Sequence, residues 1–152
     1  IEIVVAVAIM GILSGIVGLQ LRSYIAKSKN TKAVATLNTL RVAAQLYQLE
    51  NEKPLIEDSS KYEDKEEIKK ALEKLEPYLD NNAKAIIKDP EIAVGGSKKD
   101  KDSKDIKYGG KVKITFKDPD TTKNNSDGYY MWLEPISPTE ACDIKGNKWI
   151  EF

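Results

Sequence analysis

The sequence predicts an α+β fold, in which a long N-terminal helix packs against a C-terminal head with a short helix and a three-stranded antiparallel sheet. Two observations predict this fold. The uncharged stretch Ile3–Leu19 runs without a proline into an amphipathic helical pattern that continues to about Glu50. One further helical pattern and three short apolar stretches, separated by turn residues, follow. We expect an apolar helical half over 1–24, an amphipathic half over 25–51 and a globular head over 52–152.

Composition excludes most catalytic chemistry. The 152 residues include no His and a single Cys, Cys142. The chain therefore lacks His-based acid–base groups, Ser-His-Asp and Cys-His nucleophiles, Cys/His zinc sites and intrachain disulfides. We expect no enzymatic activity, and we expect Cys142 to be a small buried apolar side chain. Because 24 basic residues balance 24 acidic ones, whereas nucleic-acid-binding domains usually carry a basic excess, no nucleic-acid partner is expected.

The apolar stretch at the start of the chain is typical of a membrane-spanning helix. Its 17 uncharged residues form a helix about 26 Å long, which nearly crosses a bilayer. An uncleaved signal anchor or an ordinary single-span tether accounts for this pattern as well. Glu2 stands out, because a carboxylate in a membrane segment costs roughly 2.5–3.5 kcal/mol. It marks a partner in assembly, or else it reaches headgroups or water from its near-terminal position.

Three glycines interrupt the apolar half. Gly11, Gly15 and Gly18 each cost about 1 kcal/mol of helix propensity relative to alanine in water. The Gly11–Gly15 spacing lets membrane helices approach closely. The alternative is that these glycines allow the helix to unwind locally when neighbours supply other contacts.

The amphipathic half has an apolar residue at every third or fourth position. These residues are Ala33, Leu37, Leu40, Ala44 and Tyr47. Since the first proline is Pro54, we expect one helix about 75 Å long.

In the head, Ser60 and Glu63 form a capping-box pattern that predicts a second helix of about four turns, ending at Pro77. Its apolar face comprises Ile68, Ala71, Leu72 and Leu75.

Three strands are predicted after that helix. Apolar residues alternate with lysine and threonine in Lys111–Lys117, which follows a Gly-Gly turn. Gly128–Glu134 is apolar on both faces, and Lys148–Phe152 follows a turn at Gly146. The charged run Ser97–Asp105 is expected to be a mobile surface loop.

The most acidic loop of the head, Asp118–Gly128, is a candidate calcium site because this cation prefers oxygen ligands. The candidate ligands are Asp118, Asp120 and Asp127, with Asn124 and Asn125 beside them. The loop departs from the EF-hand pattern, since Lys123 stands where the turn glycine belongs and Tyr129 where the bidentate glutamate belongs. The same residue types form ordinary turns, so we expect a plain loop and no cofactor.

The first third of the chain resembles the type IV pilins and the pseudopilins of type II secretion. The resemblance rests on Glu2 near the start of an uninterrupted apolar helix that runs into the amphipathic stretch Lys27–Asn51. It implies a subunit held in the cytoplasmic membrane, processed by a prepilin peptidase and assembled into a surface filament by inner-membrane machinery. It further implies that Glu2 pairs with the amino terminus of a neighbouring subunit and that Gly11 lies in a helical stretch that often melts in filaments.

The chain departs from that family in three respects. Family members begin with an aromatic residue or Met a few positions before the acid, so we expect this chain to start slightly inside the mature terminus. The family often places a proline soon after the glycine, whereas this chain has none before Pro54. Many pilins close a C-terminal loop with a disulfide, which the lone Cys142 cannot form.

These observations favour a pilus subunit that assembles with copies of itself. A major pseudopilin of type II secretion, a membrane-tethered binding module and an anchored hydrolase using paired carboxylates are the alternatives. The calcium pattern that major pseudopilins often carry cannot be aligned here, which favours the pilus. Roles in adhesion, DNA uptake or motility stay open.

Overall fold

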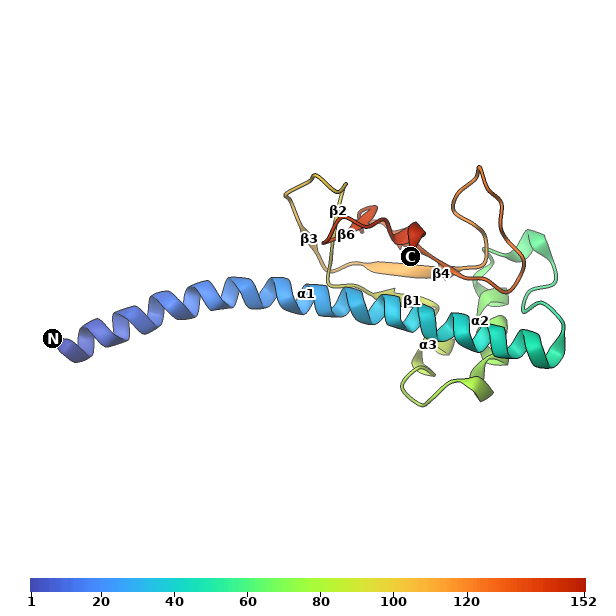
Figure 1. Ribbon diagram of the computed structural model, residues 1–152, viewed down its shortest axis with the longest axis horizontal. Coiled ribbons are helices and arrows are strands. Elements are labelled where there is room, and N and C mark those ends of the chain that lie inside the picture. Colours follow the sequence, from blue (N-terminus) through green and yellow to red (C-terminus); the bar gives the residue numbers. More distant parts are fainter.

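The computed structural model describes the backbone of residues 1–152 and every side chain except that of Leu19. It confirms the α+β fold, with helix α1 (Glu2–Asn51) running along the molecule and the head packed on its second half (Figure 1). The head contains α2 (Lys65–Lys74), α3 (Ala85–Lys88), the 3-10 turns η1 (Ser59–Lys61), η2 (Glu76–Tyr78) and η3 (Trp149–Glu151), and the strands β1 (Glu91–Ala93), β2 (Gly96–Lys98), β3 (Lys107–Tyr108), β4 (Lys111–Thr115), β5 (Trp132–Ile136) and β6 (Cys142–Asp143).

Helix α1 is continuous over 50 residues, as predicted. It ends where Glu52 adopts a left-handed backbone conformation with φ 54°, and the Glu52 N–H donates to the carbonyl oxygen of Gln48 at 3.0 Å. Pro54 follows two residues later and prevents the helix from resuming. The predicted apolar face is buried at Ala33, Leu37, Leu40 and Ala44, and Tyr47 is partly buried.

The main sheet has the strand order β1-β4-β5, and both pairings are antiparallel. The central strand β4 was predicted from its alternation, and Val112 and Ile114 are buried as expected. The strand ends at Thr115 rather than at the predicted Lys117, and Thr115 is buried although the alternation placed it on the polar face. In β5, the strand begins at Trp132 rather than at the predicted Gly128. Ile114 lies opposite Leu133 across the β4–β5 pair, which places two buried side chains side by side.

The third strand predicted at the C-terminus is wrong. Residues 149–151 form the 3-10 turn η3, and the third strand of the sheet is β1 instead. In a strand, Trp149 and Glu151 would lie on the same face. The turn allows Trp149 to be fully buried, with its ring 5.8 Å from that of Phe152, while Glu151 remains exposed.

A second sheet, with the order β3-β2-β6, occupies part of the stretch predicted to be a mobile loop. That prediction is wrong for its first residues, because Ser97 lies in β2 and is fully buried. The Ser97 hydroxyl accepts a hydrogen bond from the Glu140 N–H at 2.9 Å. The rest of the charged run forms an exposed turn, in which the Asp100 carboxylate accepts from the N–H groups of Asp102 and Ser103.

Helix α2 starts later than predicted. Asp64, not Ser60, is its N-cap, and Asp64 Oδ1 accepts from the N–H groups of Glu66 and Glu67 at 3.0 Å each. Ser60 lies instead in η1, where Asp58 Oδ1 accepts from its backbone N–H. Starting at Asp64 gives a helix of 10 residues, shorter than the predicted four turns. The predicted face is buried at Ile68, Ala71, Leu72 and Leu75.

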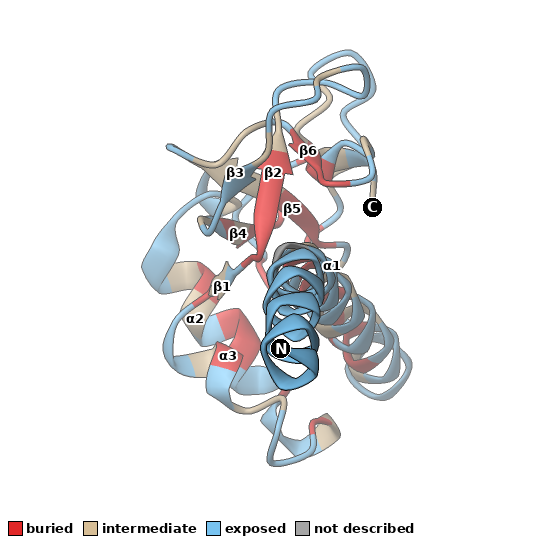
Figure 2. Ribbon diagram, turned by 90° about the vertical axis from the view of Figure 1, so that its left-hand side faces the viewer, coloured by how far each residue is buried: buried red, intermediate tan, exposed pale blue. Residues whose placement is uncertain are grey.

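The core of the head lies between the main sheet, α2 and the second half of α1. Leu37 and Leu40 from α1 are fully buried in one cluster with Phe116, Leu133 and Trp149. Viewed from the N-terminal end, buried residues gather where the head meets α1, and the first half of α1 is exposed (Figure 2). The head therefore holds α1 by its amphipathic half.

A buried asparagine fixes the second sheet to α1. The Asn30 Nδ2 donates to the Gly96 carbonyl oxygen at 2.9 Å, and Asn30 Oδ1 accepts from the Gly95 N–H at 2.8 Å. Gly95 permits this contact, since a Cβ there would lie 2.1 Å from the Ala26 carbonyl oxygen. The backbone before β2 is thus tied directly to the helix.

Asn30→Ala is expected to lower the free energy of unfolding of the head by about 1–3 kcal/mol, because it leaves buried backbone groups of Gly95 and Gly96 without partners. The control is Asn38→Ala on the exposed face of the same helix. Urea unfolding of the full chain in detergent, followed by tryptophan fluorescence, measures both. Equal midpoints for the two variants would contradict the role assigned to Asn30.

Candidate functional site

The apolar half of α1 projects beyond the head. Its described large apolar side chains are all more than half exposed in the single chain. They are Ile1, Ile3, Val4, Val5, Val7, Ile9, Met10, Ile12, Leu13, Ile16, Val17 and Leu21. By length and composition, α1 is a helix that could span a membrane. A contiguous apolar surface of this size is not stable in water and requires lipid or protein to cover it.

Glu2 lies in the first turn of α1, at the tip of this apolar half. The helix dipole places partial positive charge at this end, which favours a carboxylate. Glu2 is exposed, and the ion pairs of the described residues do not include it. The fold therefore places this carboxylate at the exposed end of the apolar half of α1, where a second molecule can reach it.

Gly11, Gly15 and Gly18 lie within unbroken helix in the single chain. A Cβ added at any of the three would meet nothing within 4 Å, so the fold of one copy does not require them to be glycine. Their spacings of four and three place them on one face of the helix. On that face the backbone is open to close approach by another helix.

In an assembled filament, Gly11–Gly18 is expected to be the least regular part of α1. Three glycines and Ser14 give this stretch the lowest helix propensity in the apolar half, and the head supports only the later part of the helix. Backbone traced in a filament density map would decide the matter. Unbroken α-helical hydrogen bonding through this stretch would contradict the prediction.

The acidic loop does not bring its candidate calcium ligands together. Among the residues that the structure describes, no group of three or more His, Cys, Asp or Glu side chains is placed to hold a metal ion. Asp118 Oδ1 and Oδ2 accept from the N–H groups of Asp120 and Asn125, at 2.9 and 3.0 Å. Asp127 Oδ1 accepts from the N–H of Tyr129 at 2.9 Å. These carboxylates therefore satisfy the backbone of a tight loop, which is the usual role of Asp in turns.

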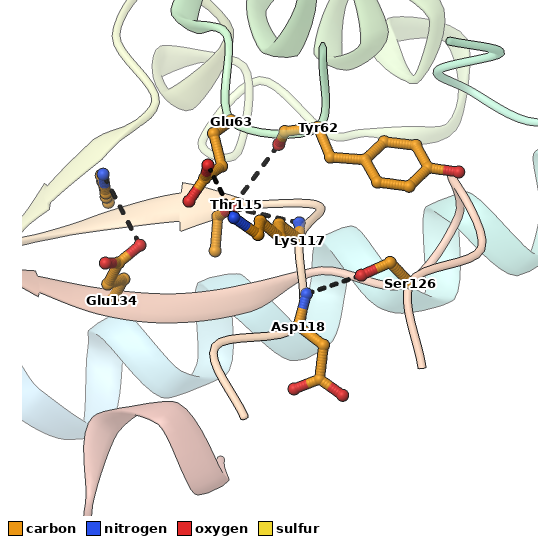
Figure 3. A network of polar contacts seen from close by, with 8 residues as sticks. Tyr62, Glu63, Thr115, Lys117, Asp118, Ser126 and Glu134 are labelled. Atoms are coloured by element: carbon orange, nitrogen blue, oxygen red, sulfur yellow. Dashed lines mark hydrogen bonds and ion pairs between the residues drawn. The ribbon is translucent and has the colours of Figure 1, made fainter. Parts of the chain in front are cut away.

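Further polar contacts lie within this loop and just before it. The Asp118 N–H donates to Ser126 Oγ at 2.7 Å, and Lys117 Nζ lies 3.1 Å from the Glu63 carboxylate (Figure 3). The Thr115 hydroxyl links β4 to the carbonyl oxygen of Tyr62 at 3.5 Å. The two contacts before the loop join the end of β4 and Lys117 to the segment that precedes α2.

Cys142 is buried in β6, as predicted for a small apolar side chain. Burial raises the pKa of its thiol above the usual value, which reduces the fraction of reactive thiolate at neutral pH.

Two arginines of α1 have structural roles that the sequence did not reveal. Arg22 lies over the ring of Tyr108 in β3, 4.0 Å from its centroid. Arg41 donates to the carbonyl oxygens of Met131 and Phe152 and lies over the ring of Tyr130. These contacts join the head to α1 at two points, and their partners are too distant in sequence for a local pattern to indicate them.

Comparison of the chain with known protein families, with curated proteins and with solved structures gives no match.

Proposed function

We propose that this protein is the structural subunit of an extracellular filament of the type IV pilus kind, built as a helical polymer of its own copies. The observation that carries the proposal is the apolar half of α1, whose described large side chains are exposed although the helix continues without a break into the part that holds the head. Lipid would cover this surface before assembly, and the helices of neighbouring copies would cover it afterwards.

The length of the apolar half suits both environments. Residues 3–21 span about 28 Å as a helix, close to the hydrocarbon thickness of a bilayer of about 30 Å. Transfer from lipid to a bundle of similar helices keeps the apolar surface out of water throughout. A membrane-held pool of subunits, extracted one at a time by inner-membrane machinery after cleavage by a prepilin peptidase, is consistent with this surface.

Glu2 favours an assembling subunit over a simple tether. A tether needs no carboxylate in its apolar segment, and a carboxylate there costs free energy on insertion. Pairing with the terminal ammonium of a neighbouring copy would give that carboxylate a partner within an apolar core. Charge pairing of this kind specifies the position of docking more than it adds stability.

The proposal is tested by shearing cells that produce the chain together with the assembly machinery of their pilus system. Electron microscopy and mass spectrometry of the sheared fraction are expected to find filaments composed of this chain. A chain that remains entirely in the membrane fraction, with no filaments, would contradict the proposal. That result would favour the alternative, a membrane-tethered binding module.

A further inference from the structure

Charged residues are unevenly distributed along the axis of α1. Residues 22–48 include five basic residues and no acidic residue. Residues 49–80 include eleven acidic and six basic residues, which gives a net charge of −5. The remaining residues of the head, 81–152, are almost balanced, with thirteen basic and twelve acidic residues.

The basic segment begins at the end of the head nearest the apolar half and runs along the head, whereas the acidic segment lies at the far end (Figure 1). Arg22 lies over Tyr108 at the end of the head nearest the apolar half. At the far end, the Tyr78 hydroxyl of η2 donates to the Glu50 carboxylate beside the C-terminus of α1. Because α1 is continuous between Arg22 and Glu50, these points are about 42 Å apart along the axis.

The charges at both ends are accessible. We define the basic end by the exposed residues Lys27, Lys29 and Lys32, none of which belongs to an ion pair of the described residues. We define the acidic end by the exposed residues Glu52, Glu57, Glu73 and Glu76, which likewise lie outside the described ion pairs. Both ends can therefore interact with charges on another molecule.

The acidic end also opposes the dipole of α1. Glu50 lies in the last turn and Glu52 at the C-cap, where the negative pole of the helix favours cations. The last turn of α1 contains no basic residue. Acidic residues at the negative pole of the helix are electrostatically unfavourable in the single chain. Their position would become favourable if cations of a second molecule faced this end.

We propose that the basic end of one copy docks against the acidic end of the next, so that copies stack head to tail along the helix axis. The inference rests on the proposed function and supplies it with a direction and an axial register. A second copy is the fitting partner because each chain carries both complementary surfaces at opposite ends. Such a heterologous contact leaves a free surface at each end of a pair and can repeat into a filament.

Charge exchange in the full chain tests the stacking. The variants are Lys27→Glu with Lys29→Glu at the basic end, Glu73→Lys with Glu76→Lys at the acidic end, and the combination of all four. The control, Lys84→Glu with Lys88→Glu near α3, changes the net charge as much as the basic-end variant. Polymer is pelleted after detergent dilution at low salt, and thermal melting of the head checks folding.

Each reversal is expected to lower the pelleted polymer by about tenfold, because it places like charges against each other. The combination is expected to recover wild-type amounts to within about twofold, and the control to match wild type. Unchanged polymer in both reversals would overturn the proposal, as would a combination that assembles no better than the reversals.

Cross-linking of the wild-type chain in detergent separates this inference from the proposed function. A carbodiimide is expected to join basic-end lysines of one copy to acidic-end carboxylates of another, as found by mass spectrometry of an isotope-mixed sample. Such cross-links without filaments on sheared cells would support the stacking and contradict the filament function. Filaments that contain no such cross-links would support the function and overturn the stacking.

Discussion

Glu2→Gln is expected to reduce the number of filaments at least tenfold at equal protein level. The substitution keeps the volume of the side chain and removes its charge. An unpaired carboxylate is strongly disfavoured in an apolar core, whereas a carboxylate paired with the terminal ammonium of a neighbour is not. Only the correct axial position of the incoming copy makes this pair, so the charge selects that position. Counting filaments by electron microscopy of sheared fractions measures the effect.

The head and the membrane pool of subunits are expected to be unaffected by this change. Glu2 lies at the tip of α1, far from the core of the head. Glu151→Gln, which removes one exposed carboxylate from the head outside the acidic end, is the matched control and is expected to change filament number less than twofold. Wild-type numbers of filaments from Glu2→Gln cells would show that Glu2 merely reaches the membrane interface.

Removal of residues 1–21 is expected to convert the protein into a soluble, monomeric head. Of the described side chains, the first that is buried belongs to Ala26, so the truncation removes no described core side chain. The deleted surface is the one that must be covered in the full chain. At about 25 cal/mol per Å² of buried apolar area, burying such a helix contributes on the order of tens of kcal/mol before the entropic costs of assembly.

Sedimentation of the truncated head in the absence of detergent measures its oligomeric state. The contrasting variant replaces residues 3–21 by another apolar span of equal length. A membrane tether would function with either span, whereas an assembling subunit needs the specific surface of its own helix. Filaments formed by the truncated head would show that the apolar half is not the element of assembly.

The long helix and the central strand could be predicted because their signals are local. Continuous hydrophobicity over residues 3–19, followed by apolar residues at Leu37 and Leu40, fixes both the helix and its buried face. In β4, buried Val112 and Ile114 alternate with lysines that face outward. Periodicity over several residues is a strong signal, and tertiary contacts here agree with it.

The errors arose where a long-range contact decides between two local possibilities. Ser60 and Asp64 are each followed three residues later by a glutamate, and burial of Ile68, Ala71 and Leu72 accompanies the later start. Ser97 lies in strand β2 next to Gly96. The carbonyl oxygen of Gly96 accepts a hydrogen bond from Asn30, which is 66 positions earlier in the sequence. The candidate site shows the same pattern. The exposed apolar half could be predicted from the local sequence, whereas the positions of the basic end and the acidic end in the head could be established only from the fold.

The most direct test of the filament account is an electron cryo-microscopy reconstruction of filaments sheared from producing cells. Residues 3–21 of successive copies are expected to pack around the filament axis, with Glu2 next to the amino terminus of a neighbour and the heads on the outside. A filament whose axis is formed by the heads, with the apolar helices exposed or absent, would contradict it.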